Sequence, residues 1–318
     1  MRLAYLATVF LLAAAPACSR PSSRSSSAVA ASWSTAAPLP ERLQEHHGAL
    51  LGGRVYVAGG FDTTGTPTKV AYRYDPARDA WERIADLPEA RHHMPLVVVH
   101  DTLYAVGGLS GMRFVAESNL WVYRPETNAW ETRAPLPAPR GASAAAVVDG
   151  KIVVVGGFGA TRALLDSTLV YDPATNRWAT RAPIPTPRDH LTAEVVRGTL
   201  YAIGGRPIDP DRNYDVVESY DLAADRWTTR ARMPSRRGGL ASAVLGGEIH
   251  TFGGETRSGV FANHEVYDPA HDRWRVAAPM PTARHGLAAV TVGDDRIYVI
   301  GGGPKAGLAQ TSVVELWR

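Results

Sequence analysis

The sequence has a single cysteine, Cys18, and very little lysine. One cysteine excludes an intrachain disulfide and any metal site made of cysteines alone. Only 3 of the 34 basic residues are lysine, the net charge is +3, and neither basic residue type forms a long run. The chain therefore lacks the basic surface that nucleic-acid-binding proteins present, and we expect no nucleic-acid partner.

Long apolar runs are missing as well, apart from one near the start. The run Leu3–Ala15 is too short to span a membrane comfortably. It has the length of a signal-peptide core, and Ala15-Pro16-Ala17 provides the small residues of a cleavage site. We predict a signal peptide over residues 1–17, a Ser-rich flexible tether over 18–31 and one folded domain over 32–318.

Cleavage after Ala17 would make Cys18 the first residue of the mature chain. That position resembles the bacterial lipobox, in which the new N-terminal cysteine is lipidated, although Ala15 and Pro16 depart from the usual residues. We therefore expect an extracytoplasmic cell-envelope lipoprotein, in the periplasm or at the outer membrane, that contacts the membrane only through an anchor at Cys18. A plainly secreted protein is the alternative.

The rest of the chain is built from repeats. Its 30 glycines and 23 prolines are many for a helical protein, because both residues break helices. Glycine pairs that end an apolar run recur 48, 49, 48, 49 and 48 residues apart, at Gly59-Gly60, Gly107-Gly108, Gly156-Gly157, Gly204-Gly205, Gly253-Gly254 and Gly301-Gly302. Tryptophans follow the same period, at Trp33, Trp81, Trp130, Trp178, Trp227 and Trp274. Two independent markers with one period indicate six repeats.

Each repeat predicts four short strands, a to d in chain order. In the second repeat, Leu96–His100 is strand a, Asp101-Thr102 is a two-residue turn, and Leu103–Val106 is strand b. After a loop of about ten residues comes strand c, Leu120–Tyr123; a tight turn then leads to Trp130, which opens strand d.

A tyrosine precedes the c–d turn at Tyr74, Tyr123, Tyr171, Tyr220 and Tyr267. With the glycine pairs and the tryptophans, these tyrosines make the chain similar to the Kelch-repeat family over about residues 32–318. The resemblance implies an all-β, six-bladed β-propeller, with four antiparallel strands in each blade around a central channel. It also implies that the repeated Gly, Tyr and Trp residues build the scaffold and make little contact with a ligand.

The markers also predict how the ring closes. Trp33 precedes Gly59 by 26 residues, so it belongs to a strand d with no strands a to c before it. The last repeat, in turn, ends after a strand c that contains Trp317. We predict that the N-terminal segment Trp33–Ala37 supplies the missing strand of the last blade, which also removes two exposed sheet edges.

Strand alternation brings the d–a connections and the b–c loops to one end of the channel, and that end is rich in arginine. The d–a connections carry Arg91, Arg140, Arg188, Arg237 and Arg284, with Arg42 one residue out of register, and the b–c loops carry Arg113, Arg162, Arg206, Arg257 and Lys305. These residues either form cationic rings that bind a carboxylate or another anion, or brace the loops through backbone carbonyls. We select the nine arginines other than Arg42 as candidate ligand-binding residues.

Histidines gather on the same connections, at His46, His47, His92, His93, His190 and His285. They lack a recognisable metal-ligand spacing, so we interpret them as polar loop residues and expect neither a metal nor a cofactor. Glu194 has no counterpart in the other repeats, whereas the strand-c residues Glu218, Glu265 and Glu315 recur and look structural. Glu194 and His190 are therefore the candidate acid/base residues, and a hydrogen-bonded strand residue is the alternative for Glu194.

Two functions follow as expectations. The first is a non-catalytic binding propeller, monomeric, that uses the loop end of the channel for a protein or carbohydrate ligand with acidic groups. The alternative is a sugar isomerase resembling the sialic-acid mutarotases. A copper-radical oxidase resembling galactose oxidase is excluded, because such an enzyme needs a Tyr–Cys cross-link and Cys18 lies in the signal region. The chain also carries no nucleophile elbow, phosphate loop or zinc signature.

Overall fold

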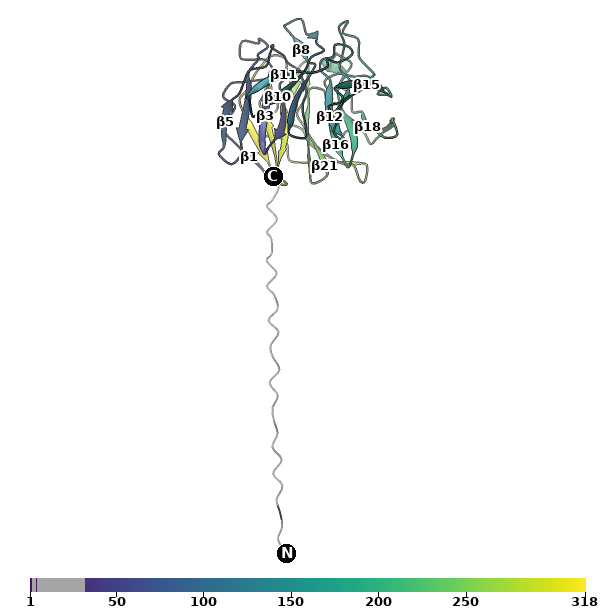
Figure 1. Cartoon of the computed structure of the whole chain (residues 1–318). Coiled ribbons are helices and arrows are strands. Elements are labelled where there is room, and N and C mark those ends of the chain that lie inside the picture. Colours follow the sequence, from purple (N-terminus) through teal and green to yellow (C-terminus); the bar gives the residue numbers. More distant parts are fainter. Residues whose placement is uncertain (2–3, 5–31) are drawn as a thin grey trace. The chain divides into compact units, whose positions relative to one another are not determined.

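The computed structural model describes Met1, Ala4 and residues 32–318. The predicted cleavage site, the tether and Cys18 lie outside these described residues. Residues 32–318 form six four-stranded antiparallel sheets, the blades of a β-propeller (Figure 1), which confirms the predicted fold class. Over this range no helix has the length and apolar character needed to cross a membrane.

Each blade contains strands a to d. They follow one another along the chain in five blades, while the sixth blade takes its strand d from the N-terminal segment. The a strands are β2 (His47–Leu51), β6 (Leu96–Val99), β12 (Ala144–Val148), β16 (Thr192–Val196), β20 (Ala241–Leu245) and β26 (Ala288–Val292). The b strands are β3 (Arg54–Ala58), β7 (Thr102–Val106), β13 (Lys151–Val155), β17 (Thr199–Ile203), β21 (Glu248–Phe252) and β27 (Arg296–Ile300). The c strands are β4 (Ala71–Asp75), β10 (Leu120–Arg124), β14 (Thr168–Asp172), β18 (Val217–Asp221), β24 (His264–Asp268) and β28 (Val314–Trp317).

The d strands are β5 (Ala80–Arg83), β11 (Ala129–Thr132), β15 (Arg177–Arg181), β19 (Arg226–Thr229), β25 (Arg273–Val276) and β1 (Trp33–Thr35). Three b–c loops hold further elements: the hairpin β8 (Leu109–Ser110) with β9 (Val115–Ala116), the hairpin β22 (Glu255–Thr256) with β23 (Gly259–Val260), and the 3-10 turn η1 (Pro210–Arg212).

The first and last strands of the propeller belong to one blade. β1 pairs antiparallel with β28, so that Trp33 lies opposite Trp317 and Thr35 lies opposite Glu315. The innermost strands of the first and last blades, β2 and β26, contact each other as well. The six a strands therefore form a closed ring around the central channel.

The a–b turn of the second blade lies one residue earlier than the sequence predicts. Thr102 and Thr199 are the first residues of β7 and β17, so the second-blade turn is His100-Asp101 instead of Asp101-Thr102, and the fourth-blade turn is Arg197-Gly198. In the fourth blade both turn residues have positive φ, 51° at Arg197 and 76° at Gly198. A two-residue hairpin turn with two positive φ values matches the twist of the strands that it joins. Threonine favours the strand conformation, so it belongs to the strand and not to the turn.

The glycine pairs join each blade to the chain that enters the next one. Gly204 has φ of 63°, and a Cβ placed on it would lie 2.7 Å from the carbonyl oxygen of Arg237. The N–H of the next residue, Gly205, donates to that same carbonyl at 2.8 Å. Only glycine permits both the backbone angle and the close approach, which explains why the pair recurs in every repeat.

The repeated tyrosines and tryptophans hold neighbouring blades together. In the fourth blade, Tyr220 packs on Trp227, and its hydroxyl donates to Asp225 Oδ1 at 2.6 Å. Asp225 Oδ1 also accepts the N–H of Ala182, while the indole N–H of Trp227 donates to the Ala182 carbonyl at 3.0 Å. The hydrophobic core fills the same spaces between blades. The predicted scaffold role of these aromatic residues is confirmed.

Candidate functional site

The central channel narrows toward the d–a connections and widens toward the a–b turns. Its middle section holds about 100 Å³ and is lined by small side chains such as Ala144 and Ala241. Toward the a–b turns it opens into a space of about 350 Å³ between apolar side chains that include Val98, Val147 and Val244. A ligand could therefore enter the channel most easily from the end opposite to the one that the sequence favours.

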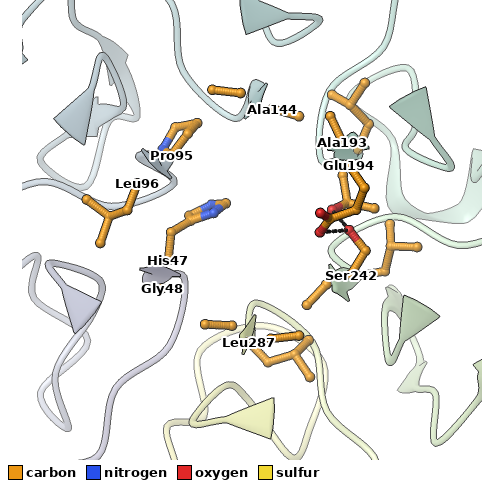
Figure 2. A pocket seen from close by; sticks show the side chains of 16 residues that line it. His47, Gly48, Pro95, Leu96, Ala144, Ala193, Glu194, Ser242 and Leu287 are labelled. Atoms are coloured by element: carbon orange, nitrogen blue, oxygen red, sulfur yellow. Dashed lines mark hydrogen bonds between the residues drawn. The ribbon is translucent and has the colours of Figure 1, made fainter. Parts of the chain in front are cut away.

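Glu194 projects into the middle of the channel (Figure 2). Its carboxylate accepts a hydrogen bond from Ser242 Oγ at 2.8 Å. Burial raises the pKa of Glu194 to about 7, although the bond from Ser242 lowers it. His47 points into the channel from the opposite wall (Figure 2), and burial lowers the pKa of His47 to about 4. Glu194 can therefore hold or release a proton near neutral pH.

Six residues with left-handed backbone close the narrow end of the channel, one from each d–a connection. This axial ring consists of Glu45, His93, Ala142, His190, Gly239 and Gly286, with φ between 51° and 69°. The N–H groups of Glu45, His93, His190, Gly239 and Gly286 each donate to the carbonyl of the preceding ring residue, at 2.7–3.0 Å. The ring places two imidazoles and one carboxylate on the channel axis.

Glu45 is the centre of a buried polar cluster on this ring. Its Oε2 lies 3.1 Å from His93 Nε2, and its Oε1 lies 3.3 Å from His285 Nδ1. His285 Nδ1 is also 3.2 Å from Glu255 Oε2. Burial alone would raise the pKa of Glu45. His93 and His285 lower it by more than burial raises it, so the pKa of Glu45 lies well below its ordinary value. Burial lowers the pKa of His285, but Glu45 and Glu255 outweigh burial and raise it.

The other candidate acid/base residue, His190, belongs to the same cluster and not to the site of Glu194. Its Nδ1 is in close contact with the Asp189 carboxylate. Neither Glu45, Asp189 nor Glu255 was a sequence candidate. Alignment of the repeats on the d–a arginines could have found the ring, because every ring residue stands two positions after the arginine, or after Leu43 in the first blade.

The arginines of the d–a connections lie inside the blades. Three of them pair with a strand-c glutamate at 2.6–2.7 Å: Arg188 with Glu218, Arg237 with Glu265, and Arg284 with Glu315. The guanidinium groups also donate to the carbonyl of the first glycine of a pair, in the contacts Arg140–Gly156, Arg188–Gly204, Arg237–Gly253 and Arg284–Gly301.

Arg91 is buried too, beside Asn119 and over the ring of Trp121. The structure therefore corrects the expectation that Arg91, Arg140, Arg188, Arg237 and Arg284 form a cationic mouth. A buried guanidinium needs partners inside the protein, and these residues have them, so they brace the loops.

Among the arginines of the b–c loops, three reach the surface. Arg113 and Arg162 are exposed, and Arg162 lies 5.4 Å from the centre of the Phe158 ring. Arg257 is also exposed but pairs with Asp209 and Asp211. Arg206 is buried, donates to Glu255 at 2.9 Å and lies 3.6 Å from Asp189, so it belongs to the cluster around Glu45.

Exposed apolar side chains mark part of the loop face. Of the four large apolar side chains that are strongly exposed within residues 32–318, three lie on b–c loops: Met112, Val115 and Leu308. Together with the exposed cations Arg113 and Lys305 they are called the loop patch below. Met112, Arg113 and Val115 belong to the second blade, and Lys305 and Leu308 belong to the sixth. The loop of the first blade lies between them, and a Cβ on its Gly65 would be 3.2 Å from Leu308.

Comparisons with known proteins agree with this architecture. The family model of the KLHDC2/KLHL20/DRC7 Kelch-repeats domain matches residues 25–205, and the Kelch motif matches residues 187–234 and 236–281. Kelch-like protein 36 of Rattus norvegicus is 35% identical over 102 residues, which are 29% of this chain and 17% of the rat protein. Kelch-like protein terF of Aspergillus terreus is 34% identical over 88 residues, which are 26% of this chain and 19% of the fungal protein.

The chain thus matches less than a fifth of the length of these curated relatives. Among solved structures, one titled "Structure of YjhT" superimposes with a TM-score of 0.75 at 17% identity, and the match covers 88% of this chain and 96% of the other. That likeness shows the fold. Because the family model covers more than half of a chain that also folds as six Kelch-type blades, this protein belongs to the Kelch-repeat family of β-propellers.

Proposed function

We propose that the protein is a non-catalytic, extracytoplasmic interaction propeller that docks an acidic protein partner on its loop patch. The observation that carries this proposal is the concentration of exposed apolar side chains on the b–c loops, at Met112, Val115 and Leu308. Soluble proteins expose few large apolar groups together unless the surface binds something. Methionine and arginine are also enriched at protein interfaces.

The charge of the loop patch specifies the partner. The exposed cations Arg113 and Lys305 stand beside the apolar side chains, and Arg162 is exposed on the neighbouring loop of the third blade. A partner with carboxylates opposite these residues would gain charge-assisted hydrogen bonds around an apolar centre. The cations in this proposal are exposed loop residues and not the buried arginines of the d–a connections. The proposal agrees with the common role of Kelch propellers as protein-interaction scaffolds.

The test compares the loop patch with exposed residues elsewhere on the propeller. Immobilised wild type, a patch variant (Met112→Ser with Leu308→Ser and Arg113→Glu) and a control variant (Val276→Ser with Arg177→Glu) are incubated with cell-envelope extract, and the retained proteins are quantified. The control residues are exposed and lie on the outer strands β25 and β15. We expect a partner that wild type and control retain, that the patch variant loses, and that high salt weakens. Equal retention by all three proteins would contradict the proposal.

The extracytoplasmic location rests on the apolar segment Leu3–Ala15 and on Cys18. Cells that produce the wild type should hold it in the membrane fraction, and Cys18→Ser should release it into the soluble extract. An unmodified mature N-terminus together with a soluble wild type would refute the lipid anchor.

Ring opening of an acidic sugar is the second candidate function, and Glu194 alone favours it. A carboxyl with a pKa of about 7 is suited to acid/base catalysis at neutral pH. Glu194 lines both the middle section of the channel, about 100 Å³, and the wider space of about 350 Å³. Most ligand pockets measure roughly 300–1,000 Å³, so a sugar would have to reach Glu194 from the wider space. If this function is correct, wild type accelerates the exchange between anomers of sialic acid in an NMR exchange experiment, and Glu194→Gln does not.

A further inference from the structure

The axial ring combines residues whose side chains ligate metals with residues that leave room for them. Glu45, His93 and His190 each offer one ligand atom, and these three atoms lie within 4.8 Å of one another. The other ring members are Ala142, Gly239 and Gly286, so nothing larger than a methyl group fills the rest of the ring. The enclosed space beside these residues is about 30 Å³, enough for an ion and a water molecule.

The distance between Glu45 and His93 fits two ligands of one ion. Their facing atoms, Glu45 Oε2 and His93 Nε2, are 3.1 Å apart. Zinc binds nitrogen and oxygen at about 2.0–2.2 Å in tetrahedral geometry, which places neighbouring ligand atoms about 3.3 Å apart. The site needs only a small adjustment of side chains to surround an ion.

Hydrogen bonds on the far side of the His93 imidazole direct its lone pair toward Glu45. His92 Nε2 lies 3.2 Å from the carbonyl of Gly111, which can only accept, so His92 Nε2 carries the hydrogen. A neutral His92 then accepts at Nδ1 from His93 Nδ1–H, at 2.5 Å, which leaves the lone pair of His93 on Nε2, the atom that faces Glu45.

The same logic applies to His190. Its Nδ1 donates to the Asp189 carboxylate, which leaves Nε2 as the nitrogen that can ligate an ion. Asp189 stands behind His190, and His92, itself held by the Gly111 carbonyl, stands behind His93. A hydrogen-bond partner behind a metal-binding imidazole fixes its tautomer and its ring orientation.

The buried charges of the cluster favour a bound cation. Three buried carboxylates, on Glu45, Asp189 and Glu255, are grouped with one guanidinium, that of Arg206. His285 lies near these groups, with its Nε2 3.1 Å from the carbonyls of Lys305 and Gly307. Its Nδ1 is buried beside two carboxylates but has no hydrogen-bond partner. The three carboxylates outnumber the guanidinium of Arg206 and the imidazole of His285 that face them, so a divalent ion on Glu45 would add favourable positive charge.

We propose that Glu45, His93 and His190 form a binding site for one zinc-class divalent cation at the narrow end of the channel. His92 and Asp189 orient the two imidazoles, and His285 lies against the second oxygen of Glu45. The ligands come from the entry segments of the first, second and fourth blades, so the ion links distant parts of the ring. Three protein ligands leave a fourth position for water or for an anionic group of a ligand.

Zinc titration of the full-length protein tests this site. The protein is stripped with a chelator, and Zn²⁺ is then added in competition with a chromophoric chelator, with Co²⁺ absorption in the visible range as a second readout. We expect one Zn²⁺ per chain and a Co²⁺ spectrum with at least one nitrogen ligand. His93→Asn and His190→Asn should each weaken binding at least tenfold. Asparagine suits both positions because it tolerates the left-handed backbone.

Two further variants separate ligation from folding. A Cβ on Gly286 would lie 2.4 Å from the Glu45 carboxylate, so Gly286→Ala should also weaken Zn²⁺ binding. His271→Ala is the matched control, because His271 is exposed beside Asp268 on a c–d turn and should bind Zn²⁺ as the wild type does. Far-UV circular dichroism without metal checks that each variant is folded. Absence of stoichiometric Zn²⁺ binding, or equal affinity in wild type, His93→Asn and His190→Asn, would overturn the site.

Discussion

The buried arginines and the axial ring residues are two positions apart in the chain, yet they behave in opposite ways. An arginine occupies its position in every repeat but the first. Its side chain lies inside the blade, where it is bonded to carbonyls. The ring residue differs from repeat to repeat and always closes the channel. Residues that recur with the period therefore build the propeller, while side chains that break the period are the ones free to carry a function.

The largest effect should come from removing the strand that completes the sixth blade. Deletion of residues 32–38 takes away β1 and leaves the edge of β28 unpaired. We expect aggregation or a large loss of thermal stability, because an open sheet edge and the apolar groups beside it become exposed. A melting temperature equal to that of the wild type would show that β1 contributes nothing to closure.

Loss of one buried arginine should be the next largest effect. Arg237→Ala leaves the Glu265 carboxylate buried without its partner, which costs about 3–5 kcal/mol of unfolding free energy. Arg257→Ala removes an exposed ion pair on a loop that water screens, and it should change the free energy of unfolding far less. Denaturant unfolding of the two variants measures the difference, and equal losses would contradict the division into buried braces and surface charges.

Glu194 breaks the repeat pattern, and it should make stability depend on pH. The folded protein keeps the Glu194 proton up to about pH 7, whereas the unfolded chain releases it near 4.5. Relative to Glu194→Gln, the wild type should therefore lose stability as pH rises from about 4.5 to about 7 and lose no more above that range. Thermal melts of both proteins at pH 5 and pH 8 check this, and parallel changes in the two proteins would place Glu194 in contact with bulk solvent.

The smallest effect should come from a single repeated hydroxyl. Tyr220→Phe removes the bond to Asp225, but Asp225 keeps the N–H of Ala182. We expect a loss of about 1 kcal/mol in unfolding free energy, typical of one hydrogen bond. Binding of Zn²⁺ should be unchanged in this variant. A loss of several kcal/mol would mean that the inter-blade contact is a network and not a sum of separate bonds.

The sequence predicted the blades well because their features recur. Six copies of the Gly-Gly pair and of the tryptophan define period, strand order and blade number without any need to know the packing. The a–b turn at His100 was misplaced by one residue because a non-glycine residue there adopts positive φ. Such a residue is uncommon in that region and leaves no composition signal.

The site was predicted less well, since a functional cluster is assembled across repeats. Glu194 was found as a carboxylate without counterparts, and its place in the channel follows from strand alternation. The arginines were placed at the correct end of the propeller, but whether they point outward or inward depends on partners such as Glu218 that lie about 30 residues away. Glu45 was overlooked because its neighbours on the axial ring come from other blades.

The central claim is that the unrepeated ring residues carry a function while the repeated residues carry stability. The most direct test is the change in melting temperature on adding Zn²⁺ to chelator-stripped wild type, Tyr220→Phe and His93→Asn. A ligand at a hundredfold excess over its dissociation constant stabilises a folded protein by about 2.7 kcal/mol. We predict a rise of several degrees in wild type and in Tyr220→Phe, and no rise in His93→Asn. An equal rise in all three proteins, or none in the wild type, would contradict the claim.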